Sequence, residues 1–450
     1  MLFSDLTFLY FFLPLVLALV FLMPAGGRNA VILAASLIFY AWGEPVYWIL
    51  MAGMIFFGYG AGFALEFYSE NRRMQKRILW IFAGTAAAIL VFFKCTKSVA
   101  FPIGISFYIF QIISYLVDIY WKRGRIQRNF IDFAMYISMF PQLIAGPIVR
   151  YEQMEGQLKE RRLSIDKIAY GIRRFAVGLA KKVILADTLA QLVEKAGVQM
   201  DMLAYYLTAI GFMMQIYYDF SGYSDMAIGL GSMMGFEFPE NFNFPYVSGS
   251  VTEFWRRWHM TLGTWFRDYV YIPLGGNRVG RIRYAFNIFA VWFLTGFWHG
   301  ASLPFILWGL YFGILLILEK GFRTTHIYDR IPALVKSMFG RIWTFFLVMA
   351  GFVLFRAENL AQAVERLKGL FGGAGAARVT QISLYYLRDF SGILILSFVF
   401  MTPVMRVVRE KFEERAWFCA LESAVCLLLF LLSTAFTIDS SFQPFLYFRF

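Results

Sequence analysis

A succession of apolar segments with the length of α-helices runs through the 450-residue chain and constrains its fold more than any other feature. A helix needs about 20 residues to cross the hydrocarbon core of a membrane, whereas barrel strands alternate over about 10 residues. Because these segments are continuous rather than alternating, they predict an all-α polytopic membrane protein. They lie at residues 6–23, 30–42, 46–65, 78–93, 101–121, 130–149, 203–221, 284–297, 303–318, 342–355, 392–405 and 417–436.

The overall composition supports a membrane protein. Hydrophobic residues make up 60% of the chain, charged residues make up 16%, and the mean hydropathy is +0.60. A soluble domain is closer to half apolar and a quarter charged. Several segments are shorter than a straight span, which favours broken or re-entrant helices. We expect about eleven transmembrane helices, with re-entrant and interfacial helices around a central tunnel.

Lysine and arginine positions orient the predicted bundle. The basic connections at 69–77 and 122–128 are separated by two predicted spans, so both belong in the cytoplasm under the positive-inside rule. The first apolar segment lacks the basic region and cleavage site of a signal peptide, so we expect it to remain as a span. Its N-terminus is then extracytoplasmic. The basic loop at 406–415 is cytoplasmic, which sends the tail at 437–450 to the outer side.

The net charge of +13 does not indicate nucleic-acid binding. The basic residues lie beside apolar segments, where topology determinants and contacts to anionic membrane lipids belong. On a cytoplasmic face they would also attract a polyanion such as a coenzyme A nucleotide.

Cysteines and histidines give no metal-binding pattern. Cys95, Cys419 and Cys426 lie in or beside apolar segments without disulfide or ligand spacing, so we expect buried packing roles. The three histidines are widely separated, and no metal site is predicted.

His299 is the leading candidate for a catalytic residue. It lies within 284–320, where almost every residue is apolar or small, so its imidazole is expected at membrane depth. Ionisable groups there are costly and usually functional. A neutral imidazole bonded to a backbone carbonyl is the alternative, and the residue alone leaves both interpretations open.

The segment at 236–283 is too polar to span a membrane and too aromatic for a solvated loop. It carries Glu253-Phe254-Trp255-Arg256-Arg257-Trp258-His259, followed by a Gly-Gly pair. Tryptophan and tyrosine beside arginine favour the headgroup depth, and irregular backbone is tolerated there when it lines an enclosed cavity. We interpret the segment as a re-entrant funnel leading toward His299. An interfacial anchor is the alternative.

Two further segments depart from the alternation of spans and loops. The segment at 150–191 mixes basic and apolar residues, which is typical of an amphipathic helix that lies in the cytoplasmic interface or dips partway into the bundle. A basic surface helix is the alternative. The polar run that contains Asp219, Ser221 and Tyr223 is suited to orienting a histidine or a substrate, or to capping a helix break.

Several motifs, taken in order, resemble those of the membrane-bound O-acyltransferase family. Within it the chain is similar to the membrane subunits that O-acetylate alginate and to peptidoglycan O-acetyltransferases. The resemblance runs nearly end to end, and jointly the motifs are specific. They lie at 141–148, 218–225, 254–259, 271–276, 297–300 and 444–450.

The resemblance implies an O-acyltransferase of the bacterial cytoplasmic (inner) membrane. Such enzymes take an acyl group from a cytoplasmic thioester, commonly acetyl-CoA, and move it through the bundle without a tightly bound cofactor. An extracytoplasmic acetyltransferase resembling SGNH hydrolases then places it on a polysaccharide acceptor. The family histidines fall on His299 and His259. Tyr447, in the external tail, matches the position of a candidate acyl carrier, whereas its aromatic neighbours suit an interfacial anchor.

The chemistry of acyl transfer assigns roles to these residues. A base must take the proton of the acceptor hydroxyl, and burial favours the neutral, basic form of His299. His259 is suited to orienting the thioester or polarising its carbonyl, or to a structural role. Arg256 and Arg257 are candidates for coenzyme phosphates, with anionic lipid as the alternative. Trp258 and Trp298 complete the predicted substrate-binding residues.

Two other functions were weighed against this one. D-alanyl export for teichoic acid modification belongs to the same family but uses a separate tail peptide, and the aromatic tail here argues against it. A secondary transporter or flippase would show matched halves, and none is evident. We therefore expect one integral-membrane domain over 1–450, divided into N-terminal helices (1–149), cytoplasmic interfacial helices (150–202), a catalytic core (203–320), C-terminal helices (321–436) and a tail (437–450).

Overall fold

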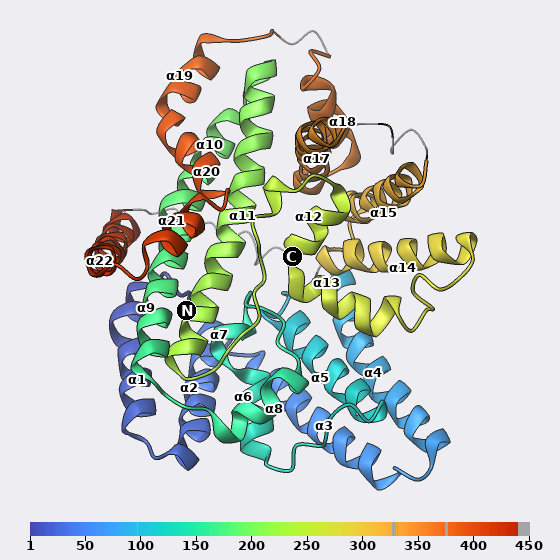
Figure 1. Cartoon of the computed structure of the whole chain (residues 1–450). Helices are drawn as coiled ribbons and strands as arrows, with labels where there is room; N and C mark the ends of the chain where they lie inside the picture. The colour runs from blue at the N-terminus through green and yellow to red at the C-terminus, as the bar shows by residue number, and fades with distance from the viewer. Residues whose placement is uncertain (97, 326–329, 331, 374–376, 440–450) are drawn as a thin grey trace. The chain divides into compact units, whose positions relative to one another are not determined.

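A computed structural model describes the chain except for residues 97, 326–329, 331, 374–376 and 440–450. Every regular element in the described part is a helix, as the apolar segments predict (Figure 1). The chain forms two compact units. Unit 1 comprises Met1–Leu179 and Tyr223–Glu240, and unit 2 comprises Ala180–Gly222 and Asn241–Phe450.

Unit 1 is built around α5 (Ile105–Tyr120), which is buried on almost all sides and contacts α3 and α4. Gly62 on α3 allows a close approach, because a Cβ atom there would lie 2.7 Å from the Tyr115 hydroxyl oxygen. The other elements of unit 1 are η1 (Phe8–Phe12), α1 (Leu13–Leu22), η2 (Ala25–Gly27), α2 (Arg28–Gly43), α3 (Trp48–Phe67), α4 (Arg72–Cys95), α6 (Phe130–Ser138), α7 (Phe140–Leu143), α8 (Tyr151–Glu160) and α9 (Ile165–Ala180).

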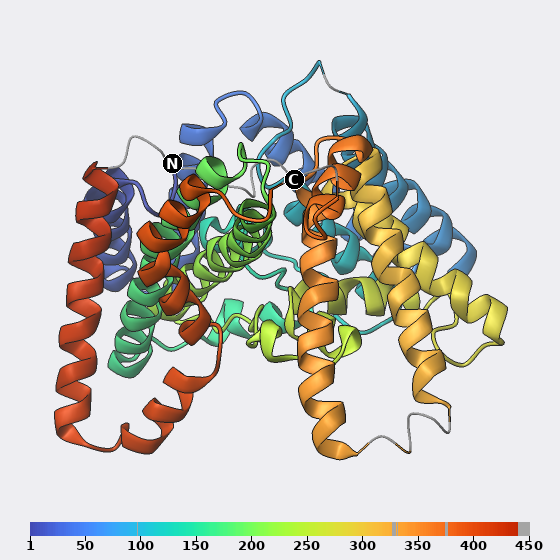
Figure 2. The same cartoon turned by 90° about the horizontal axis from the view of Figure 1, so that it is seen from above.

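Unit 2 has its own aromatic core, contributed mainly by α11, α12, α15 and α17. In Figure 2, α15 and α17 lie side by side as two long orange helices. The elements of unit 2 are η3 (Lys181–Ala186), α10 (Asp187–Ala196), the first part of α11 (Met202–Met233), η4 (Pro245–Val247), α12 (Val251–Arg257), α13 (Met260–Phe266), η5 (Arg267–Tyr271), α14 (Arg281–His299), α15 (Leu303–Arg323), α17 (Ala333–Arg356), α18 (Leu360–Gly369), α19 (Gln381–Asp389), α20 (Ser391–Phe400), α21 (Val404–Phe412) and α22 (Ala416–Asp439).

Five described helices are long and apolar enough to cross a membrane, namely α3, α4, α15, α17 and α22. The pair formed by α19 and α20 is bent by 54° and makes a sixth span if it is counted as one. Such a bend agrees with the expectation of broken helices. The predicted total of about eleven spans stays a prediction.

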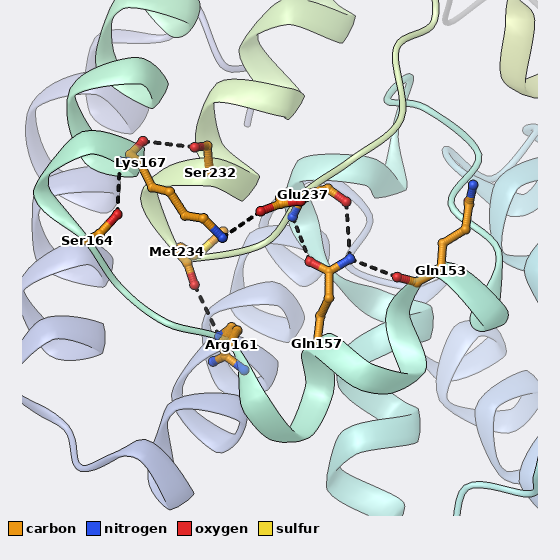
Figure 3. Close-up of polar contacts among 8 residues, drawn as sticks. All are labelled: Gln153, Gln157, Arg161, Ser164, Lys167, Ser232, Met234 and Glu237. Atoms are coloured by element: carbon orange, nitrogen blue, oxygen red, sulfur yellow. Dashed lines mark hydrogen bonds and ion pairs between the residues drawn. The ribbon is translucent and has the colours of Figure 1, made fainter.

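Side chains of α8 and α9 anchor the segment that leaves α11 in unit 1 (Figure 3). The Gln157 side-chain amide donates to the Glu237 carbonyl at 3.2 Å and accepts from its N–H at 2.7 Å. Lys167 lies 2.7 Å from the Glu237 carboxylate, and the Arg161 guanidinium donates to the Met234 carbonyl. These contacts therefore hold Met234 and Glu237, which lie shortly before Asn241 in the chain, within unit 1.

The segment at 150–191 differs from a simple basic surface. Arg174 pairs with Asp225 and Glu240 inside unit 1, with nitrogen–oxygen distances of 2.6 Å to each carboxylate. Lys182 is only 3% exposed. These ion pairs, which sequence spacing does not reveal, disfavour a simple basic surface helix for this part of the segment.

The cysteine prediction was partly wrong. Cys426 is buried, as expected, but Cys95 and Cys419 are exposed in the structure. An apolar neighbourhood in sequence therefore did not imply burial within the protein.

Candidate active site

The hairpin of α14 and α15 positions His299. Its helices pack closely because a Cβ atom at Gly296 would collide with the Phe305 carbonyl, and one at Gly309 would collide with the Trp292 carbonyl. Helix α14 ends at His299, where the extended backbone of Gly300 breaks the helix before α15 begins. The His299 side chain is therefore held at the closed end of a tight hairpin.

Aromatic rings surround His299. The edge-on rings of Trp308 on α15 and Phe355 on α17 each have centroids 5.0 Å from the imidazole centroid. Phe305 lies at 6.3 Å. The imidazole is half-buried in this apolar setting.

His259 lies in the same unit and is 3% exposed. Its ring centroid is 4.6 Å from that of Phe220 and 6.1 Å from that of Trp298, whose own centroid is 4.6 Å from that of His299. Trp298 therefore separates two imidazoles that are 40 residues apart in sequence. The structure brings together these three residues, all predicted from the sequence.

The backbone at His259 is unusual. It joins α12 to α13 with φ 43°, in the left-handed region that residues other than glycine rarely adopt. Such conformations cost about 1–3 kcal/mol and cluster at functional sites.

Asn241 fixes the tautomer of His259. The Asn241 Oδ1 atom lies 3.0 Å from His259 Nδ1 and also accepts from the Thr261 N–H and hydroxyl. An atom that accepts from a backbone N–H must be the amide oxygen, so His259 Nδ1 carries the proton. The lone pair of the neutral ring is then on Nε2.

Burial controls the charge of His259, which lies outside the candidate spans. Desolvation lowers the pKa of His259 to about 3, so the ring is neutral at physiological pH. A neutral ring with its lone pair on Nε2 accepts a hydrogen bond there. It does not act as a cation that polarises a carbonyl.

The predicted binding residues at the end of α12 and directly after it differ in their surroundings. Trp258 is buried and stacks on Phe254 with centroids 5.5 Å apart, so it belongs to the core of unit 2. Arg257 pairs with Glu253 at 2.8 Å and donates to the Asn243 carbonyl. Arg256 is exposed. Only Arg256 therefore presents its guanidinium away from the unit.

The polar run on α11 is divided between the units. Asp219 and Ser221 are buried in unit 2, whereas Tyr223 is buried in unit 1 and stacks on Phe3 with centroids 4.5 Å apart. Lys182 bridges Asp219 at 3.0 Å and Asp187 at 2.6 Å. Asp219 thus belongs to a buried ion cluster.

Tyr447 lies outside the described residues. The described residues hold no group of three or more side chains arranged as metal ligands.

Sequence reasoning missed three residues of this region. Asn241 gave a weak signal, since it lies in the Asn-Phe-Asn stretch of the predicted funnel. Lys182 lies in the segment predicted to be amphipathic; its partner Asp187 is five residues away, but the spacing does not indicate its remote partner Asp219. Trp308 contacts the His299 ring only because α14 and α15 pack as a hairpin, so this contact becomes evident only in the structure.

The arrangement suits proton transfer in a water-poor, aromatic environment. A neutral imidazole in such a setting is chemically able to act as a general base.

Comparison with known proteins identifies the family. Residues 126–360 match the model of the membrane-bound O-acyltransferase family. The chain is 37% identical to a probable alginate O-acetylase of Pseudomonas putida over 100% of both chains. It is 34% identical to a peptidoglycan O-acetyltransferase of Helicobacter pylori, covering 84% of this chain and 81% of that protein.

A more distant relative is the teichoic acid D-alanyltransferase of Bacillus subtilis, 31% identical over 50% of this chain and 60% of that protein. The family match and the apolar helices make the chain a multi-pass membrane protein, and the O-acetylating relatives make it an O-acyltransferase. With two imidazoles held around Trp298 in the matched region, the chain belongs to the membrane-bound O-acyltransferase family.

Proposed function

We propose that this enzyme takes an acetyl group from cytoplasmic acetyl-CoA and moves it across the membrane for O-acetylation of an extracytoplasmic polysaccharide. The acceptor is an alginate-like exopolysaccharide or peptidoglycan. The support is the extent of similarity, since the O-acetylating relatives match over most of the chain and the D-alanyltransferase matches over half. Transfer onto the polysaccharide is assigned to an extracytoplasmic partner of the SGNH-hydrolase type.

The observation that carries the proposal is the cluster of His259, Trp298 and His299 within unit 2. In the proposed step, His299 takes the proton of an acceptor hydroxyl as the hydroxyl oxygen attacks the thioester carbonyl. A tetrahedral oxyanion forms and collapses, the carbon–sulfur bond breaks, and the proton passes to the departing thiolate. Neutral His259 accepts a hydrogen bond at Nε2 and orients the reacting group.

Tyr447 is the proposed acceptor hydroxyl on the same chain. Its acetyl ester would then be passed to the extracytoplasmic partner. This role requires the tail to be outside, as the charge pattern predicts. Arg256 is the better candidate for a coenzyme phosphate than Arg257, because Arg257 already pairs with Glu253.

The test is reconstitution of the purified protein with radiolabelled acetyl-CoA. Thioester cleavage should be lost by at least about a hundredfold in His299→Ala, the scale of general-base assistance. Label retained on the protein should disappear in Tyr447→Phe and persist in Tyr385→Phe, an exposed tyrosine of unit 2. Full turnover by His299→Ala would reject the catalytic assignment, and label retained by Tyr447→Phe would reject the relay alone.

A further inference from the structure

A small cavity in unit 2 lies between the C-terminal end of α17 and the N-terminal part of α11. Its volume is about 20 Å³, and one water molecule needs roughly 10–15 Å³ on the same measure. The walls include the aromatic rings of Phe212 and Phe352. The cavity therefore has room for a single small ion or group and for nothing of nucleotide size.

The lining of this cavity is positively charged. It includes the guanidinium groups of Arg356 and Arg366, and no carboxylate is among the described residues that line it. Burial lowers the pKa of Arg366, and the carboxylates of Glu358 and Glu365 offset this only in part. Two cations thus share a small space.

Two buried donors that line the cavity lack an acceptor. The Arg356 Nη2 atom donates to the Val193 carbonyl at 3.4 Å, but its Nη1 atom is buried without a partner in the described part of the chain. The same holds for the hydroxyl of Thr208, a residue that is 8% exposed. Buried donors are almost always paired, so an acceptor belongs here.

We propose that this cavity binds one small monovalent anion, a halide or the carboxylate of a small acid, held by Arg356 Nη1 and Thr208 Oγ1. A water molecule would accept these hydrogen bonds but would bring no negative charge to the two guanidinium groups, which Glu358 and Glu365 compensate only in part. An anion would accept both hydrogen bonds and would also bring negative charge to the guanidinium groups. Hydrogen bonds to charged groups are stronger than those between neutral groups.

The anion site is linked to the candidate active site through α17. Arg356 directly follows Phe355, whose ring packs edge-on against His299 with centroids 5.0 Å apart. Phe352, one turn earlier, is part of the cavity wall. An anion at Arg356 therefore fixes the end of α17 that forms one wall around His299. This inference does not depend on the acyl donor or on the acceptor.

The test uses the full-length protein in detergent and follows thermal unfolding by tryptophan fluorescence. Chloride and acetate are titrated separately, and isethionate keeps the ionic strength constant. We expect a saturable rise in the midpoint temperature that is lost in Arg356→Gln. The matched control is Arg388→Gln, which removes an exposed arginine of the same unit and should behave as the wild type.

A second variant keeps the proposal testable if Arg356→Gln fails to fold. Thr208→Val removes the neutral donor at nearly constant volume and should weaken anion binding by roughly tenfold or more. A response to chloride alone identifies a halide site, and a response to acetate as well identifies a carboxylate site. No saturable response in the wild type, or an unchanged one in both variants, overturns the proposal and leaves bound water as the occupant.

Discussion

The amide oxygen of Asn241 lies 3.0 Å from Nδ1 of His259 and accepts two hydrogen bonds from Thr261 at the same time. This single atom holds the imidazole in one tautomer and one orientation. It also ties the segment before α12 to the first turn of α13. The relationship makes Asn241 a positioning residue for His259.

Replacing Asn241 tests that relationship. Asn241→Ala removes the hydrogen bond that keeps the proton on Nδ1, so part of the population adopts the other tautomer. We expect kcat to fall by about ten- to a hundredfold, the equivalent of roughly 1.5–3 kcal/mol. Steady-state acyl transfer by the reconstituted enzyme measures this. Asn243→Ala, whose amide oxygen contacts Arg406 instead, is the control and should retain much more activity.

The pH dependence of stability reports on His259. Its folded-state pKa of about 3 is below the ordinary value of 6.5, so the unfolded state binds the proton more tightly. The contribution of His259 to the free energy of unfolding is therefore complete above pH 6.5 and is lost as the pH falls toward 3. We expect this histidine to contribute a slope of about 1.4 kcal/mol per pH unit in that window.

Unfolding of wild type and His259→Asn should be compared between pH 4 and pH 7. The variant lacks the titrating ring, so its stability should fall less steeply with acid. Equal slopes would show that His259 is not desolvated in the folded state.

The close packing of α14 against α15 predicts the effect of adding one methyl group at Gly309. Gly309→Ala places a Cβ atom against the Trp292 carbonyl and must force the helices apart, at a cost of about 1–3 kcal/mol. Because α14 ends at His299, activity should fall together with the unfolding temperature. Gly321→Ala lies on the same helix with nothing within 4 Å of the added atom. If both variants behave alike, the close contact does not position His299.

The buried ion cluster makes a stability prediction. Lys182→Met leaves Asp187 and Asp219 buried without their shared cation, so the free energy of unfolding should fall by about 3–5 kcal/mol. Denaturant unfolding in detergent measures this loss. Lys181→Met, at the neighbouring half-buried position, should cost far less, and an equal loss in the two variants would contradict the assigned role of Lys182.

Much of the fold class was predictable because it depends on local composition. Continuous apolar segments permit only helices in a membrane, and the structure contains only helices in its described part. The ordered motifs also indicated that His259 and His299 belong to one site. Both histidines lie within residues 126–360 and contact Trp298.

Contacts made by turns and by remote partners were not predictable. Asn241 and His259 are 18 residues apart, and His259 adopts a left-handed conformation between α12 and α13; no periodic pattern encodes this contact. Lys182 seemed to belong to a polar helix face because its partner Asp219 is distant in sequence. The apolar composition of a helix also does not determine the number of spans. A short apolar helix crosses the membrane only where neighbouring helices pack against it.

The positive φ angle at position 259 determines how substitutions there must be interpreted. Replacing His259 by alanine would remove the imidazole. It would also place in the same turn a residue that rarely adopts the left-handed conformation. Lost activity would then combine missing chemistry with a misfolded junction. Comparing asparagine and glycine replacements, both of which accept this conformation, separates the two effects. A loss of activity common to both replacements belongs to the ring itself.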